Sequence, residues 1–171
     1  MQHTFTLIHW FGPFTLDEVI NSDWGREKGL YIATGKTKGS RSDSSIQYCG
    51  ITDRPYSNRF KNHDTLPNIT RELQIWLGDV VVSPYPSRNS TKLKEPERLL
   101  TYYLDFELNL LNKKNLNSKP EIGTLVNYWF KKDRTLRARK PIEMNDLPDV
   151  ISWDGEVFRS GKLSIHYDDY E

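Results

Sequence analysis

Two short apolar segments joined by a polar loop constrain the fold of this chain most. Residues 29–34 read Gly-Leu-Tyr-Ile-Ala-Thr, and residues 46–52 read Ile-Gln-Tyr-Cys-Gly-Ile-Thr. Both segments are rich in β-branched and aromatic residues, and Gly, Ser and Lys dominate the loop between them. This composition is typical of two strands and their connection. The pattern therefore predicts a β-hairpin and a fold that contains an antiparallel sheet.

The strongest helical signal lies between residues 95 and 111. Four leucines recur there at the spacing of one face of an amphipathic helix; they are Leu100, Leu104, Leu108 and Leu111. At about 100° per residue, Glu97 falls in the same angular sector as these leucines, and Glu95 lies nearly opposite. An unpaired buried carboxylate costs several kcal/mol. We therefore expect Glu97 to have a charged partner, a metal ion, solvent access or a contact with the helix N-terminus.

The remaining elements complete an expected α+β domain. A helix after Pro55 is expected to run to about His63, and the apolar residues in 72–83 predict a third strand, interrupted at Gly78-Asp79. We thus predict a small three-stranded antiparallel sheet flanked by helices. The chain of 171 residues fits a single domain, with a core at 28–115.

Both flanks of this core are interpreted as extensions. In the N-terminal extension, 1–27, residues 3–10 alternate loosely and predict an edge strand before a short capped helix. In the C-terminal extension, 116–171, the type of the apolar segment 125–130 stays open between helix and strand. Further on, segments at 150–153 and 163–167 predict a hairpin.

The net charge of +1 hides a division along the chain. Residues 110–141 hold nine basic and two acidic residues, a local net charge of +7, whereas residues 142–171 hold two basic and eight acidic residues, a local net charge of −6. A basic segment can contact DNA phosphates, or it can be a solvated face that the acidic segment partly neutralises. The residues chosen as candidate DNA contacts are Lys113, Lys114, Lys131, Lys132 and Arg137.

Cysteine content and hydropathy bear on location. Cys49 is the only cysteine, which fits a reducing compartment. The sequence has neither a long apolar run nor a signal-peptide pattern at its start. We expect a cytoplasmic protein that does not interact with membranes.

An ordered set of polar residues supplies candidate chemistry. Tyr31 and Tyr48 share a sheet face if the two strands pair with these positions close together, and Arg59 and His63 lie one helical turn apart. Arg suits phosphate oxygens, and His can relay a proton near neutral pH. Each residue alone also fits an ordinary structural role, as a packed strand tyrosine or a solvated helix pair.

Taken in order, these residues resemble the motifs of the GIY-YIG nuclease family. Gly29-Leu30-Tyr31 and Tyr48-Cys49-Gly50 are similar to the two name-giving motifs, and the family places an Arg, often followed four residues later by His, on the next helix. Glu97 matches the family's metal-binding Glu, and Asn109 follows it at about the family's separation. The link between the tyrosines is longer than usual, and the Pro that often precedes the Asn is absent. Asn112, Asn115 or Asn117 are therefore alternatives to Asn109.

The resemblance implies a metal-dependent DNA endonuclease. Glu97 would bind Mg²⁺ or Mn²⁺, Arg59 would counter developing charge, Tyr48 would hydrogen-bond water or phosphate, and Asn109 would set local geometry. The general base stays open between Tyr31 and His63. The alternative hypotheses are an inactive nucleic-acid-binding module on the same fold and a protein-interaction domain. A protein partner or a homodimer is compatible with all three.

Overall fold

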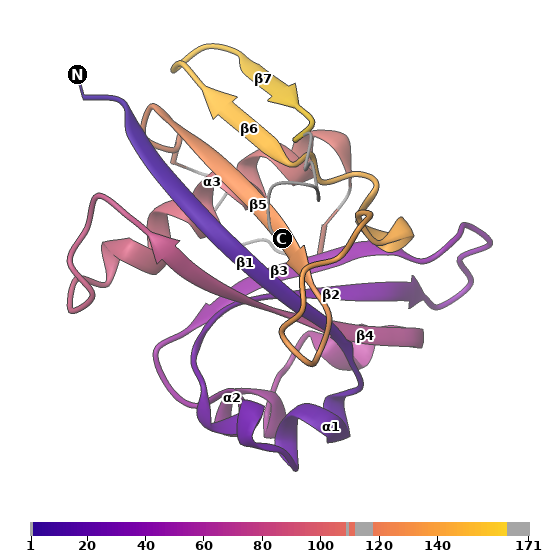
Figure 1. The fold of residues 1–171 in the computed structure, drawn as a ribbon. Coiled ribbons are helices and arrows are strands. Elements are labelled where there is room, and N and C mark those ends of the chain that lie inside the picture. The colour runs from indigo at the N-terminus through magenta and orange to yellow at the C-terminus, as the bar shows by residue number, and fades with distance from the viewer. Residues whose placement is uncertain (1, 109, 112–117, 164–171) are drawn as a thin grey trace.

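The computed structural model describes residues 2–108, 110–111 and 118–163, and it places a single mixed sheet at the centre of the molecule (Figure 1). The strands are β1 (Thr4–Phe14), β2 (Gly29–Thr37), β3 (Ser45–Thr52), β4 (Ile69–Val82), β5 (Gly123–Phe130), β6 (Val150–Trp153) and β7 (Phe158–Gly161). The α-helices are α1 (Leu16–Ile20), α2 (Tyr56–Lys61) and α3 (Thr91–Glu107). Short 3₁₀ helices span Asp23–Arg26, Leu66–Asn68 and Ile142–Met144. None of the described helices combines the length and apolar character needed to cross a bilayer.

The predicted fold class is wrong. The seven strands form one sheet in the order β3-β2-β4-β1-β5-β6-β7, in which only the β1–β5 pair is parallel. The expected three-stranded sheet flanked by helices is therefore replaced by a larger, mostly β architecture. The cause is β1, which pairs with β4 on one side and β5 on the other and so joins the two halves of the sheet.

Some of the other predicted strands are wrong and some are confirmed. β1 lies in the middle of the sheet rather than at its edge, and β4 is continuous through Gly78 and Asp79. Residues 125–130, for which the sequence allows either a helix or a strand, belong to strand β5. The β2–β3 hairpin is confirmed, and so is a hairpin near the C-terminus. Its second strand is β7, which ends at Gly161, and not the predicted segment 163–167, of which 164–167 lie outside the described residues.

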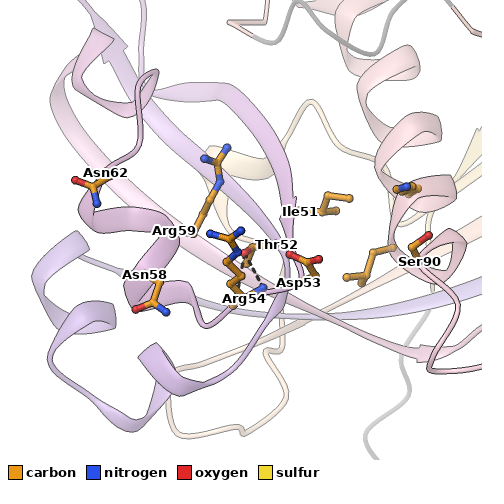
Figure 2. Close-up of a pocket in the computed structure, with 10 residues that line it drawn as sticks. Ile51, Thr52, Asp53, Arg54, Asn58, Arg59, Asn62 and Ser90 are labelled. Carbon is orange, nitrogen blue, oxygen red and sulfur yellow. Dashed lines mark hydrogen bonds between the residues drawn. The ribbon is translucent and has the colours of Figure 1, made fainter.

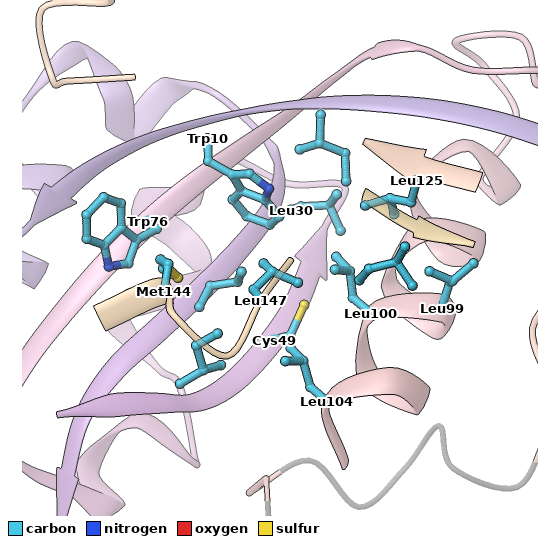
Figure 3. Close-up of a cluster of buried hydrophobic side chains, with 14 of the residues drawn as sticks. Trp10, Leu30, Cys49, Trp76, Leu99, Leu100, Leu104, Leu125, Met144 and Leu147 are labelled. Atoms are coloured by element: carbon cyan, nitrogen blue, oxygen red, sulfur yellow. The ribbon is translucent and has the colours of Figure 1, made fainter. Parts of the chain in front are cut away.

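Two apolar clusters cover opposite faces of the sheet because side chains alternate along each strand. On one face, Leu30 and Cys49 pack with Leu100 and Leu104 of α3, as Figure 3 shows. On the other face, Tyr31 packs with residues of α1 and α2. The sheet therefore separates α3 from the two shorter helices, which Figure 1 also shows. Consecutive positions in β2 and β3 consequently serve different sides of the molecule.

Candidate active site

The two candidate tyrosines lie on the same face of the β2–β3 hairpin. Tyr31 pairs with Gly50, and Ala33 pairs with Tyr48, so the two tyrosines are diagonal neighbours. Their rings are stacked, with 5.9 Å between centroids and 21° between planes. Tyr31 has no exposed surface, whereas Tyr48 is half-buried. Solvent therefore reaches Tyr48 but not Tyr31.

Gly50 makes this stacking feasible. A Cβ atom at position 50 would lie 2.6 Å from both Cζ and Oη of Tyr31 and 2.8 Å from Cε1 of Tyr48. Contacts this short require the rings to move. The glycine of the second motif is thus needed because the Tyr31 ring passes directly over its backbone.

Helix α2 brings Arg59 to the tyrosines. The Tyr56 hydroxyl, in the first turn of α2, donates to the Leu30 carbonyl at 2.7 Å, and the Phe60 ring packs edge-on against Tyr31 at 4.9 Å. These two contacts fix the helix against β2. Arg59 Nε then donates a hydrogen bond to the Tyr31 hydroxyl at 3.2 Å. The charge of Arg59 also acts to lower the pKa of Tyr48, so the guanidinium influences both phenols.

His63 follows α2 and completes the cluster. Its Nδ1 accepts hydrogen bonds from the backbone N–H groups of Thr65 and Leu66, at 3.1 and 3.2 Å. In the neutral ring the proton must then be on Nε2, which lies 2.9 Å from the Tyr31 hydroxyl and donates to it. Burial, followed by the charge of Arg59, lowers the pKa of His63 to about 4. His63 is therefore a neutral hydrogen-bond donor at neutral pH.

The hydrogen bonds give the two phenols different roles. The Tyr31 oxygen accepts from Arg59 and His63, so its own proton is free to point towards the hydroxyl of the stacked Tyr48. Burial raises the pKa of Tyr31, and Arg59 opposes that rise. Burial also raises the pKa of Tyr48, but the bonds from Tyr31 and the charge of Arg59 act to lower it. Tyr48 is thus the end of a donor chain that begins at Arg59 and His63.

Glu97 approaches the cluster from the other helix. It lies in α3 with 7% of its surface exposed, which confirms the prediction that this carboxylate faces inward. Its negative charge raises the pKa of both Tyr48 and Cys49, where burial is the larger cause in each case. Since those residues sit on opposite faces of β3, Glu97 lies close to this edge strand of the sheet.

The donor chemistry at Glu97 fits a magnesium ion. A carboxylate is a hard oxygen ligand, and Mg²⁺ commonly uses one or two protein carboxylates while water and substrate phosphate complete its octahedron. Within the described ranges, no group of three or more His, Cys, Asp or Glu side chains is arranged to hold a metal. A bound Mg²⁺ would therefore rely on Glu97 as its main protein ligand.

The three predicted DNA-contacting residues that the structure describes, Lys131, Lys132 and Arg137, make their contacts outside this cluster. Asn109, Lys113 and Lys114 lie outside the described residues, as do the alternatives Asn112, Asn115 and Asn117. Lys131 is exposed just beyond β5. Lys132 pairs with Glu18, and Arg137 Nη2 donates to the Gly12 carbonyl at 2.8 Å. The Arg137 contact is structural, because it ties the segment after β5 to β1.

A polar cavity beside the tyrosine cluster was missed by sequence reasoning. It has a volume of about 580 Å³ and lies between α2 and the start of α3 (Figure 2). Arg59 lines it together with Arg54 and Lys94, and Asp53 is its acidic residue. Arg54 comes just after β3 and Lys94 in the first turns of α3. In sequence they are 40 residues apart, and each is an ordinary surface cation. No local signal predicts that they meet.

Comparisons of the chain with family models, curated proteins and solved structures found no match.

Proposed function

We propose that this protein is a metal-dependent DNA endonuclease that uses chemistry of the GIY-YIG type. One observation carries the proposal: four predicted residues from separate parts of the sequence form a single cluster of hydrogen bonds and stacked rings, and the fifth, Glu97, acts on it electrostatically. The four are Tyr31, Tyr48, Arg59 and His63. The proposal rests on this arrangement of side chains and not on the fold class, which differs from the predicted one.

Tyr48 is the residue that positions the attacking water. It has exposed surface and stands at the end of the donor chain, whereas Tyr31 is fully buried. His63 is a poor base because its Nδ1 is already occupied by two N–H groups. Tyr48 therefore accepts a hydrogen bond from the attacking water. Once Tyr48 has lost its own proton to solvent, against the rise in pKa that burial causes, the phenolate takes the water's proton. Tyr31 and His63 are positioning residues that act through Tyr48.

Arg59, and a metal ion held by Glu97, would stabilise negative charge at the phosphate. Arg59 donates to Tyr31 and lines the adjacent cavity, so its guanidinium is placed to neutralise charge that develops on phosphate oxygens. Glu97 would hold Mg²⁺, which when bound polarises a phosphate oxygen and stabilises the leaving oxygen. The bond from phosphorus to the leaving oxygen breaks as the water oxygen attacks in line, and the leaving oxygen takes a proton from solvent.

A plasmid-nicking assay tests this function. Wild type, Glu97→Gln and Asp105→Asn are purified identically and incubated with supercoiled DNA and Mg²⁺. Loss of a metal ligand removes several kcal/mol of transition-state stabilisation, so Glu97→Gln should nick at least about 100-fold more slowly. Asp105→Asn removes another carboxylate from α3 and should match wild type.

Two outcomes would reject the proposal. Equal nicking by wild type and Glu97→Gln would mean that any activity comes from elsewhere. If the wild type nicks no DNA with Mg²⁺ or Mn²⁺ but binds it in a salt-sensitive manner, the protein is the inactive binding module that the sequence leaves as an alternative.

A further inference from the structure

The cavity between α2 and α3 carries an excess of unpaired positive charge. Arg54 and Lys94 are exposed, Arg59 is half-buried, and one acidic residue, Asp53, faces these three cations. No ion pair among the described residues includes any of the three. Like charges gathered around one hollow repel each other and attract anions. The cavity is therefore suited to an anionic ligand.

Neutral hydrogen-bond donors lie beside these cations. Asn58 of α2 and Asn62, which directly follows that helix, also line the cavity. Side-chain amides and guanidinium groups are common partners of DNA phosphate and sugar oxygens. The carboxylates of an acidic protein segment would form ion pairs with the cations but would be a poorer match for the neutral hydrogen-bond donors. A phosphodiester uses both.

We propose that this cavity binds a backbone phosphate of duplex DNA adjacent to the scissile one, through Arg54 and Lys94. Arg59 links the two positions, since its Nε donates to Tyr31 while the residue also lines the cavity. Successive phosphates along one strand match two anion sites that share an arginine. The inference rests on the proposed function for the identity of the ligand. According to this inference, the protein binds DNA beside the candidate active site and not through the basic segment 110–141.

The test is the salt dependence of DNA binding by the double variant Arg54→Gln/Lys94→Gln. A labelled duplex is titrated in EDTA, so that no cleavage is needed, and affinity is followed by fluorescence anisotropy from about 50 to about 200 mM salt. Loss of this one phosphate contact should reduce the steepness of log K against log[salt] by about 0.9. Over that fourfold range the wild type should therefore lose about 3.5-fold more affinity than the variant.

A matched control changes the same residue types elsewhere. Lys38→Gln/Arg41→Gln removes two exposed cations from the loop between β2 and β3, at the end of the hairpin opposite the cavity. This variant should keep the wild-type slope. Equal slopes for wild type and the cavity variant would overturn the inference, as would an equal change in both variants or no DNA binding at any salt. Inorganic phosphate binding that the cavity substitutions weaken, with DNA binding unaffected, would also overturn it.

Failure here and failure of the proposed function are distinguishable. Nicking that depends on Glu97, together with an unchanged salt slope in the cavity variant, rejects the phosphate site and leaves the nuclease in place. A reduced salt slope without nicking supports the phosphate site and rejects the nuclease. Both variants alter exposed side chains, and thermal unfolding checks that their folds match the wild type.

Discussion

Acidification should destabilise the folded protein through His63. The imidazole is buried, and Nδ1 accepts hydrogen bonds from two backbone N–H groups. A proton on Nδ1 would break these bonds and be repelled by both N–H groups. Burial lowers the pKa of His63 from 6.5 to about 4 in the folded state. The unfolded chain therefore takes up the proton first, and stability is lost as pH falls from about 6.5 towards 4. Linkage gives a loss of about 2 kcal/mol by about pH 5 and about 3 kcal/mol when the loss is complete.

The assay is urea unfolding of wild type and His63→Gln at pH 7 and pH 5. Glutamine can accept from the backbone and donate to Tyr31 as neutral histidine does, but it does not titrate. Carboxylates that titrate in the same range affect both proteins, so the difference between them isolates His63. The wild type should lose about 2 kcal/mol more than the variant. His3→Gln, at an exposed histidine before β1, controls for the loss of one imidazole. Equal losses in wild type and His63→Gln would refute the proposed protonation state.

Two further predictions concern the stacked tyrosines. Gly50→Ala forces a Cβ into the Tyr31 ring and should cost about 1–3 kcal/mol in urea unfolding. Gly161→Ala, whose Cβ would meet only Val150 at 3.8 Å, should change stability by less than about 0.5 kcal/mol; similar costs at both positions would contradict the steric argument. Tyr48→Phe should slow nicking by about 100-fold or more if Tyr48 contacts water, whereas Tyr31→Phe should have the smaller effect. The reverse order in matched nicking rates would return the role of base to Tyr31.

The local parts of the site could be predicted because short-range periodicity encodes them. The two apolar segments around residue 40 pair as expected, and alternation places both tyrosines on one face. The phase of the leucines likewise placed Glu97 inward. The start of α3 was harder to predict. The helix begins at Thr91, four residues before the expected start. Pro96 is misleading because proline is typical of a first helical turn, whereas here it lies inside the helix.

The sheet as a whole could not be predicted from the same signals. Strands β1 and β5 pair in parallel across more than 100 residues of sequence, and no local pattern specifies that partnership. Burial on both sides also removes the alternation that would identify a strand at 125–130, where Leu125, Val126 and Trp129 are all buried. Without β1 and β5 the remaining hairpin and β4 look like a complete small sheet. The predicted fold class failed for that reason.

The chemical role of each site residue depends on individual hydrogen bonds, which the topology does not determine. His63 looks like a proton acceptor in the sequence, yet the N–H groups of Thr65 and Leu66 turn it into a donor towards Tyr31. Tyr31 then has two donors on its oxygen and no exposed surface, so in the proposed mechanism it is Tyr48 that contacts water. The residue types follow from motif order, but backbone amides beyond the motif decide which nitrogen carries the proton. Assigning the base among such residues therefore requires the hydrogen-bond direction at each atom, and the difference in pH-dependent stability between wild type and His63→Gln tests the protonation state of His63 on which that direction depends.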